Sequence, residues 1–185
     1  MFWRRRLPHW VPEDSIVFVT WRLAGTLPQP PPGTSDPGKA FLNEDRQLDR
    51  TADGPHWLKI PQIAAMVEDA LLHGEQTRQA YDLHAWAIMP NHVHLVLQPC
   101  HKLPEIMPWL KTSTSVRANR LLRSTEPFWA REYYDHWIRN RRELRSIITY
   151  VEENPVNAEL VLSPELWPWS SARKTTGDNF AGVTA

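Results

Sequence analysis

The sequence predicts an α+β fold, a ferredoxin-like sandwich in which an antiparallel sheet carries helices on one face. Short stretches of β-branched and aromatic residues are typical of strands, and elsewhere apolar residues recur at helical spacing. The two kinds of segment follow one another as strand, helix, strand, strand, helix, possible strand, helix. That order is the order of the ferredoxin-like sandwich.

The first part of the chain combines a strand, a proline-rich stretch and a helix. Residues 15–23 alternate β-branched and aromatic residues, so we expect a strand there. From about 25–56 the many prolines disfavour a helix or central strand, and only a charged piece at 43–50 has helical character. We interpret this stretch as an insertion or long loop without an assigned function. Residues 60–73 have helical spacing, and Gly74 is the expected helix end. Its expected buried face consists of Ile63, Met66, Val67, Ala70 and Leu71.

A hairpin follows in the middle of the chain. Residues 81–89 and 92–98 are both rich in residues that favour strands, and Pro90-Asn91 between them is turn chemistry. Because the connection is so short, the two strands must be antiparallel neighbours.

The last part of the chain predicts two helices. Residues 104–123 and 141–154 have helical spacing, and Pro155 is expected to end the second helix because the residue before a proline is disfavoured in helical backbone. The segment 127–138 between them can include another strand. A tail at about 160–185 completes a single domain covering 1–185, and we expect residues 166–171 to pack back on the body. The expected buried residues are Ile106, Trp109, Leu110, Val116 and Leu121 in the first helix, and Leu144, Ile147, Ile148 and Val151 in the second.

Composition restricts the class of protein. A chain of 185 residues is long enough to bury a real core, and its net charge of zero means that any nucleic-acid surface must come from local clustering of charge. The single cysteine excludes an internal disulfide framework and fits a reducing, cytoplasmic environment. No stretch approaches the roughly 18 apolar residues of a membrane span, so we expect no membrane partner.

Two histidines open the second strand of the hairpin. His92 and His94 are two residues apart, so both imidazoles leave the same side of the sheet while Val93 enters the other. Two imidazoles placed in this way can chelate one cation. The alternative is a pair of ordinary polar residues on a solvated face.

Tyrosine and asparagine side chains on the last helix are candidate partners of this pair. Tyr150 and Asn154 lie four residues apart, so they share a helix face and can offer a phenol and an amide oxygen. The alternatives are a tyrosine at the core boundary and an asparagine that stops the helix before proline. Tyr133 and Tyr134, in the aromatic segment, are the other candidate nucleophiles.

Several segments carry a resemblance to a known family. Residues 86–96 (WAIMPNHVHLV) resemble the His-hydrophobic-His segment of the single-tyrosine HUH transposases, the IS200-like family. Residues 137–140 (WIRN), 150–158 (YVEENPVNA) and 167–172 (WPWSSA) resemble the subgroup of REP-associated tyrosine transposases, and 17–22 is similar to their opening strand. The resemblance covers most of the chain outside the proline-rich stretch.

The resemblance implies an enzyme of DNA transposition. It implies that His92, His94 and Asn154 bind Mg²⁺ or Mn²⁺, and that Tyr150 attacks a phosphate of single-stranded DNA. The products are then a 3′-hydroxyl and a 5′-phosphotyrosine. A second 3′-hydroxyl can reverse this step and join strands without ATP. Two alternatives stay open: a nucleic-acid-binding module that no longer cuts, and a zinc hydrolase built on the histidine pair.

A basic region lies around the proposed nucleophile. Residues 111–145 contain nine lysines and arginines but four acids, which suits contacts with DNA phosphates, although a solvated helix face is the alternative. The candidate DNA-binding residues are Arg139, Arg141, Arg142, Lys111 and Arg117. By resemblance, the partner is single-stranded or hairpin DNA from palindromic repeats. The resemblance leaves the oligomeric state open between a monomer and a homodimer, in which the tyrosine helix is kept or exchanged.

Overall fold

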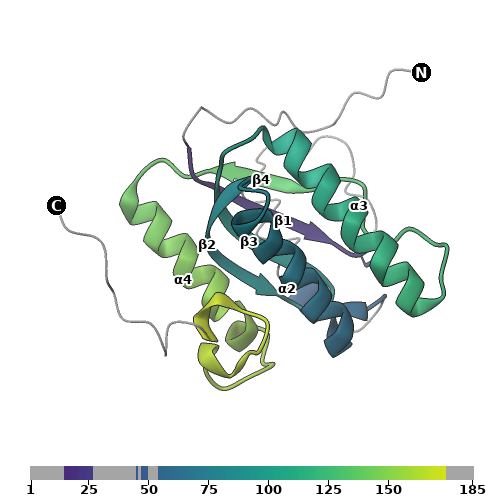
Figure 1. Ribbon diagram of the computed structural model, residues 1–185. Coiled ribbons are helices and arrows are strands. Elements are labelled where there is room, and N and C mark those ends of the chain that lie inside the picture. Colours follow the sequence, from purple (N-terminus) through teal and green to yellow (C-terminus); the bar gives the residue numbers. More distant parts are fainter. Residues whose placement is uncertain (1–14, 27–44, 46, 50–53, 174–185) are drawn as a thin grey trace, which may run out of the picture.

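The computed structural model describes residues 15–26, 45, 47–49 and 54–173 (Figure 1). The elements follow in the predicted order, and the possible strand of the aromatic segment is present as the fourth strand. They are β1 (Val17–Arg22), α2 (Pro61–Gln76), β2 (Tyr81–Ile88), β3 (His92–Pro99), α3 (Leu103–Leu122), β4 (Tyr134–Trp137) and α4 (Arg141–Asn157), with short 3₁₀ turns η1 (Trp57–Lys59), η2 (Pro164–Leu166) and η3 (Ser171–Arg173).

The four strands form one antiparallel sheet in the order β2-β3-β1-β4. The hairpin predicted from residues 81–98 is its β2-β3 pair, and β1 lies between β3 and β4. This is the strand order of a ferredoxin-like sandwich, so the predicted α+β class is confirmed. The C-terminal segment also packs on the body as expected, because Ser170 pairs with Ala87 at the β2 edge.

The helices are divided between the two faces of the sheet. α2 and α3 share a core with the side chains of Val19 and Leu95, as a one-faced sandwich requires. α4 instead packs against the opposite face, where Val151 joins Phe18 and Val96. The physical reason is that β1 and β3 also carry apolar side chains on the second face, Phe18 and Val96, so that face needs a cover as well. The expectation that the helices share one face therefore holds for α2 and α3, and α4 departs from it.

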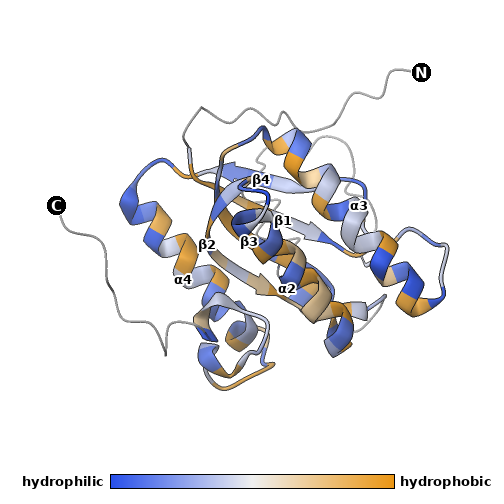
Figure 2. Ribbon diagram, in the orientation of Figure 1, coloured by the Kyte–Doolittle hydropathy of each residue, from blue (hydrophilic) through white to orange (hydrophobic). Residues whose placement is uncertain are grey.

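The predicted buried faces are confirmed for α2 and only partly for α3. All five apolar positions predicted for α2 are buried. In α3, Val116 and Leu121 are 53% and 55% exposed, so the prediction was wrong there. Thr114 and Ala118 take the inner positions of this half of the helix, which turns Val116 and Leu121 outward. Figure 2 shows that hydrophobic and hydrophilic residues are mixed along α3.

Gly74 does not end α2, contrary to the prediction. It lies inside the helix, which continues to Gln76. A Cβ added at Gly74 would overlap the ring and hydroxyl of Tyr81, whose Oη donates a hydrogen bond to the Leu71 carbonyl oxygen over 2.8 Å. The glycine is therefore needed for the contact between α2 and β2.

We expect Gly74→Ala to lower the free energy of unfolding by about 1–3 kcal/mol, because the added methyl overpacks the α2-β2 contact. Alanine's better helix propensity offsets about 1 kcal/mol of that cost at most. Urea unfolding measures the change, with exposed Gln76→Ala as the control in the same turn. A Gly74→Ala protein as stable as the control would contradict the packing role.

α4 also runs further than predicted, through Pro155 to Asn157. A proline removes one helical hydrogen bond, to the residue four positions earlier, but its fixed φ suits helical backbone. The amide of Ala158 still donates to the Asn154 carbonyl oxygen over 2.9 Å, so the helix is closed after the proline. Asn154 therefore lies inside the helix with 1% of its surface exposed, and the prediction that Pro155 ends the helix was wrong.

Most of the proline-rich stretch lies outside the described residues. Within it, Asp45 and residues 47–49 have helical backbone, as expected for the charged piece at 43–50. No helix in the described part of the chain has the length and apolar character needed to cross a membrane.

Candidate metal and nucleophile site

The two histidines of β3 lie completely buried on the α4 side of the sheet. His92 and His94 are both 0% exposed, and their Nε2 atoms are 2.9 Å apart. Val93 points into the opposite core, as the alternation of the strand predicts. The alternative of a solvated histidine pair is therefore wrong.

Each imidazole is oriented by a contact at its Nδ1. His92 Nδ1 lies 2.7 Å from Asn91 Oδ1, and His94 Nδ1 lies 2.8 Å from Thr20 Oγ1. Asn91 uses its amide nitrogen to donate to the Leu48 carbonyl oxygen, so its Oδ1 is the atom left to accept from His92. With the proton on Nδ1, the Nε2 lone pair of His92 points into the site. This is the arrangement in which metal-binding histidines are usually held.

Burial also fixes the charge of the two imidazoles. It lowers the pKa of His92 to about 3. It lowers the pKa of His94 well below the usual value, and the neighbouring His92 acts in the same direction. Both rings are therefore neutral near neutral pH, which is the form that binds metals.

A carboxylate that sequence analysis did not single out completes the group. Asp45 is 2% exposed, and its Oδ1 lies 3.3 Å from His94 Nε2 and 3.7 Å from His92 Nε2. One helical turn later, Asp49 Oδ1 lies 3.9 Å from His92 Nε2. The spacing of these two acids was a signal that they share a face, but only the tertiary fold brings them to the histidines.

Tyr150 reaches this group from α4. Its hydroxyl donates a hydrogen bond to Asp45 Oδ2, and its ring centroid is 5.8 Å from that of His94. The Tyr150 ring also contacts Phe18 edge-on at 6.1 Å. The structure therefore brings the predicted nucleophile and the histidine pair together within one chain.

Asn154, the predicted third ligand, lies one turn after Tyr150 on α4. Its side chain is buried, and its Oδ1 has no hydrogen-bond partner among the described residues. A buried acceptor of this kind calls for a partner outside the protein, such as a cation.

The donor set fits a divalent cation. Candidate ligand atoms of Asp45, His92 and His94 all lie within 4.8 Å of one another. Two imidazole nitrogens with a carboxylate oxygen suit several first-row metals, and the carboxylate adds the hard oxygen that Mn²⁺ and Mg²⁺ prefer. Oxygen from Asn154 is compatible with the same ions.

Residues 65–154, which include both histidines, Tyr150 and Asn154, match the family described as "Transposase IS200 like". This segment of the chain is therefore similar to IS200-like transposases. A curated protein of Haemophilus influenzae named as a REP-associated tyrosine transposase is 29% identical over 115 residues. That alignment covers 52% of this chain and 63% of the relative, so less than two thirds of the relative is matched.

A solved structure shares the fold of this chain. It is described as a REP-associated tyrosine transposase bound to a REP hairpin, and its TM-score is 0.63 at 18% sequence identity. The match covers 95% of this chain and 86% of that chain. At this identity the likeness concerns the fold alone.

The other two candidate tyrosines lie elsewhere in the fold. Tyr133 is buried in the core beneath α2 and α3, on the side of the sheet away from His94. Tyr134 is on the histidine side, in β4, and its ring packs edge-on against Phe18. Tyr150 is the one that contacts both His94 and Asp45.

The arginines proposed to bind DNA surround the start of α4. Arg139, Arg141 and Arg142 are all exposed. The first turn is capped by Asn140, whose Oδ1 accepts from the Glu143 amide over 3.0 Å. The location of the three arginines on the α4 side of the sheet agrees with a role near the site. Their contact with DNA stays a prediction.

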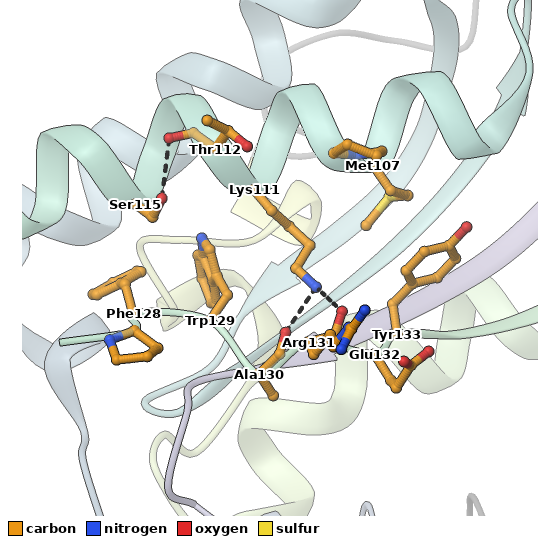
Figure 3. A pocket seen from close by; sticks show the side chains of 12 residues that line it. Met107, Lys111, Thr112, Ser115, Phe128, Trp129, Ala130, Arg131, Glu132 and Tyr133 are labelled. Atoms are coloured by element: carbon orange, nitrogen blue, oxygen red, sulfur yellow. Dashed lines mark hydrogen bonds between the residues drawn. The ribbon is translucent and has the colours of Figure 1, made fainter. Parts of the chain in front are cut away.

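Lys111 and Arg117 lie on α3, on the other side of the sheet. Lys111 lines a hollow between α3 and the segment before β4 (Figure 3). Its Nζ donates hydrogen bonds of 2.7 Å to the carbonyl oxygens of Ala130 and Arg131. The ammonium group therefore ties this segment to α3, and DNA binding by Lys111 and Arg117 stays a prediction.

Proposed function

We propose that this protein cuts and rejoins single-stranded DNA through Tyr150, beside a divalent cation, at hairpin-forming repeats. The observation that carries the proposal is the contact between Tyr150 and Asp45. One carboxylate oxygen of Asp45 accepts from the phenol, and the other lies 3.3 Å from His94 Nε2. A nucleophile and a cation site therefore share one side chain.

His92, His94 and Asp45 are the residues that would hold the ion, with Asn154 as a further oxygen ligand. When bound, Mn²⁺ or Mg²⁺ supplies positive charge that polarises a phosphate and favours the phenolate form of tyrosine. The two buried imidazoles are held in fixed positions and are neutral, so Asp45 would be the anionic ligand among the three and part of the ion's positive charge would remain for the substrate.

Tyr150 performs the covalent step. Its Oη forms a bond to phosphorus while the bond from phosphorus to the 3′-oxygen breaks, which leaves a 5′-phosphotyrosine. Asp45, which already accepts the phenolic hydrogen bond, is placed to take the phenol's proton and pass it to water. The departing 3′-oxygen takes a proton from water. A 3′-hydroxyl of another strand can run the same step backwards, because the ester retains the energy of the broken bond.

The substrate and assembly follow from similarity and from the position of α4. Hairpin DNA is proposed because a protein of the same fold is described with a REP hairpin. We propose that Arg139, Arg141 and Arg142, which are exposed at the start of α4, contact its phosphates. α4 packs on the sheet of its own chain, so a monomer suffices for chemistry, although a homodimer is compatible. We propose that it acts in the cytoplasm, where chromosomal repeats are accessible.

The test combines the protein, Mn²⁺ and end-labelled single-stranded hairpin DNA. We expect a protein–DNA adduct that survives denaturation, a free 3′-hydroxyl on the released strand, and loss of both with EDTA. Cleavage without any adduct would instead favour hydrolysis by a metal-activated water. Binding without cleavage of any hairpin would favour a DNA-binding module that does not cut.

Thr20→Val tests the contact that orients His94. Thr20 Oγ1 lies 2.8 Å from His94 Nδ1, and valine keeps the shape of threonine without the hydroxyl. Loss of such a contact behind a ligand typically lowers metal affinity by about 10–100-fold, and we expect a loss of that order for Mn²⁺. Titration followed by electron paramagnetic resonance measures it, and exposed Thr112→Val on α3 is the control. Equal affinities would show that Thr20 does not orient the ring.

A further inference from the structure

Arg22, at the end of β1, is a basic residue that the proposed function has not used. In the β1-β3 register it lies directly opposite His92, just as Thr20 lies opposite His94. Directly opposed residues in an antiparallel pair have Cβ atoms about 4.5–5.5 Å apart. The position of Arg22 is therefore next to the first histidine of the site.

The side chain of Arg22 leaves the sheet on the histidine side. Residues two apart in a strand share a face, and Thr20 Oγ1 contacts His94 on that face. Phe18, two residues earlier, also stacks on His94 with ring centroids 5.6 Å apart. The same alternation sends Trp21 into the opposite core. Arg22 thus extends a row of side chains along the site.

The turn after β1 holds the guanidinium in place. Arg22 Nη1 donates to Thr26 Oγ1 over 3.2 Å. Thr26 is 4% exposed, and its hydroxyl donates to the Leu23 carbonyl oxygen over 2.9 Å. The backbone is fixed as well, because the Ala130 amide donates to the Arg22 carbonyl oxygen over 2.9 Å. Arg22 is half-buried, so its charged end is held close to the body.

The surroundings of His92 already accommodate anionic oxygen. Carboxylate oxygens of Asp45 and Asp49 lie 3.7 and 3.9 Å from His92 Nε2. Arg22, opposite His92 in the β1-β3 register, adds a permanent positive charge to this end of the sheet. Guanidinium groups match phosphate oxygens in geometry and can bind them with two parallel hydrogen bonds.

We infer that Arg22 binds a phosphate of the DNA strand at the His92–His94 site and positions it for Tyr150. The inference rests on the proposed function, because it takes DNA as the ligand of this site. It adds a phosphate contact on β1, separate from the arginines at the start of α4. The alternative role for Arg22 is simple neutralisation of Asp45 and Asp49. In that case, removal of the arginine would leave DNA binding unchanged.

The experiment compares Arg22→Gln with Arg120→Gln. Arg120 is exposed on α3, on the opposite face of the sheet, and loses the same charge. Binding of a fluorescein-labelled hairpin oligonucleotide with randomised single-stranded flanks is followed by anisotropy at several salt concentrations and constant Mn²⁺. We expect Arg22→Gln to weaken binding by roughly tenfold. We also expect the slope of log affinity against log salt to fall by about 0.7, the value for one phosphate of a single strand.

Arg22→Lys provides the rescue, and circular dichroism checks the fold of each variant. We expect lysine to restore the salt slope but only part of the affinity, because it keeps the charge without the two-pronged geometry. An unchanged slope in folded Arg22→Gln, or an equal loss in Arg120→Gln, would overturn the inference.

The outcome also separates this inference from the proposed function. If the wild type forms a covalent adduct and Arg22→Gln matches it in rate and salt slope, the inference fails and cleavage stands. If no hairpin gives an adduct but Arg22→Gln still lowers the slope, the phosphate contact stands and the cleavage proposal fails.

Discussion

Tyr150→Phe is expected to abolish the covalent protein–DNA adduct and to lower strand cleavage by at least about 10³-fold, because it removes the nucleophilic oxygen itself. Phenylalanine keeps the ring contacts with Phe18 and His94, so the fold and the sheet-α4 packing should persist. The lost hydrogen bond to Asp45 is expected to cost about 1 kcal/mol of stability. Quenched single-turnover reactions with labelled hairpin DNA and Mn²⁺ measure the loss.

Tyr134→Phe is the matched control for this prediction. It removes a hydroxyl on the same face of the sheet, from a ring that also packs against Phe18. We expect its adduct yield to remain within a few-fold of the wild type. Hairpin affinity should be retained in both variants, since neither change removes a positive charge. An adduct that persists in Tyr150→Phe would contradict the assigned nucleophile.

His94→Ala is the second change for which we expect a large effect. It removes one of the two imidazole nitrogens proposed to bind the cation and breaks the contacts with Thr20 and Asp45. We expect Mn²⁺ affinity to fall by at least about 100-fold, more than for a residue that only orients a ligand. Adduct formation should become undetectable at Mn²⁺ concentrations that saturate the wild type.

The loss of His94 must be separated from loss of the fold. Thr20 Oγ1 loses its buried partner, which typically costs about 1–3 kcal/mol, so unfolding is measured in parallel. His94→Gln retains volume and a polar end and serves as the milder variant. His101→Ala, at an exposed position, controls for loss of an imidazole. Unchanged Mn²⁺ affinity in folded His94→Ala would remove this residue from the ligand set.

Local sequence patterns predicted the elements well because they arise from short-range preferences. The alternation before and after Pro90-Asn91 was enough for the β2-β3 hairpin, and with it for the shared face of His92 and His94. Helical spacing likewise placed Tyr150 and Asn154 on one side of α4. These features depend on residues no more than a few positions apart.

What depended on tertiary packing was missed. The pattern around Asn154 suggested a helix end, but packing of α4 on the sheet carries the helix through Pro155. Asp45 lies more than 40 positions from the histidines, in a charged and proline-rich stretch, so no local pattern linked it to them. The packing of α4 on the second face of the sheet could not be predicted for a related reason. Phe18 and Val96 indicate that this face is apolar, but they do not indicate which helix packs on it.

Mass spectrometry of the covalent adduct tests the central claim most directly, because it asks which atom of the protein holds the DNA. The adduct formed with Mn²⁺ and hairpin DNA is digested with trypsin and nuclease, and the modified peptide is fragmented. The account predicts a nucleotide attached through its 5′-phosphate to Tyr150. Attachment at Tyr133, Tyr134 or another residue, or cleaved DNA with no modified peptide, would contradict it.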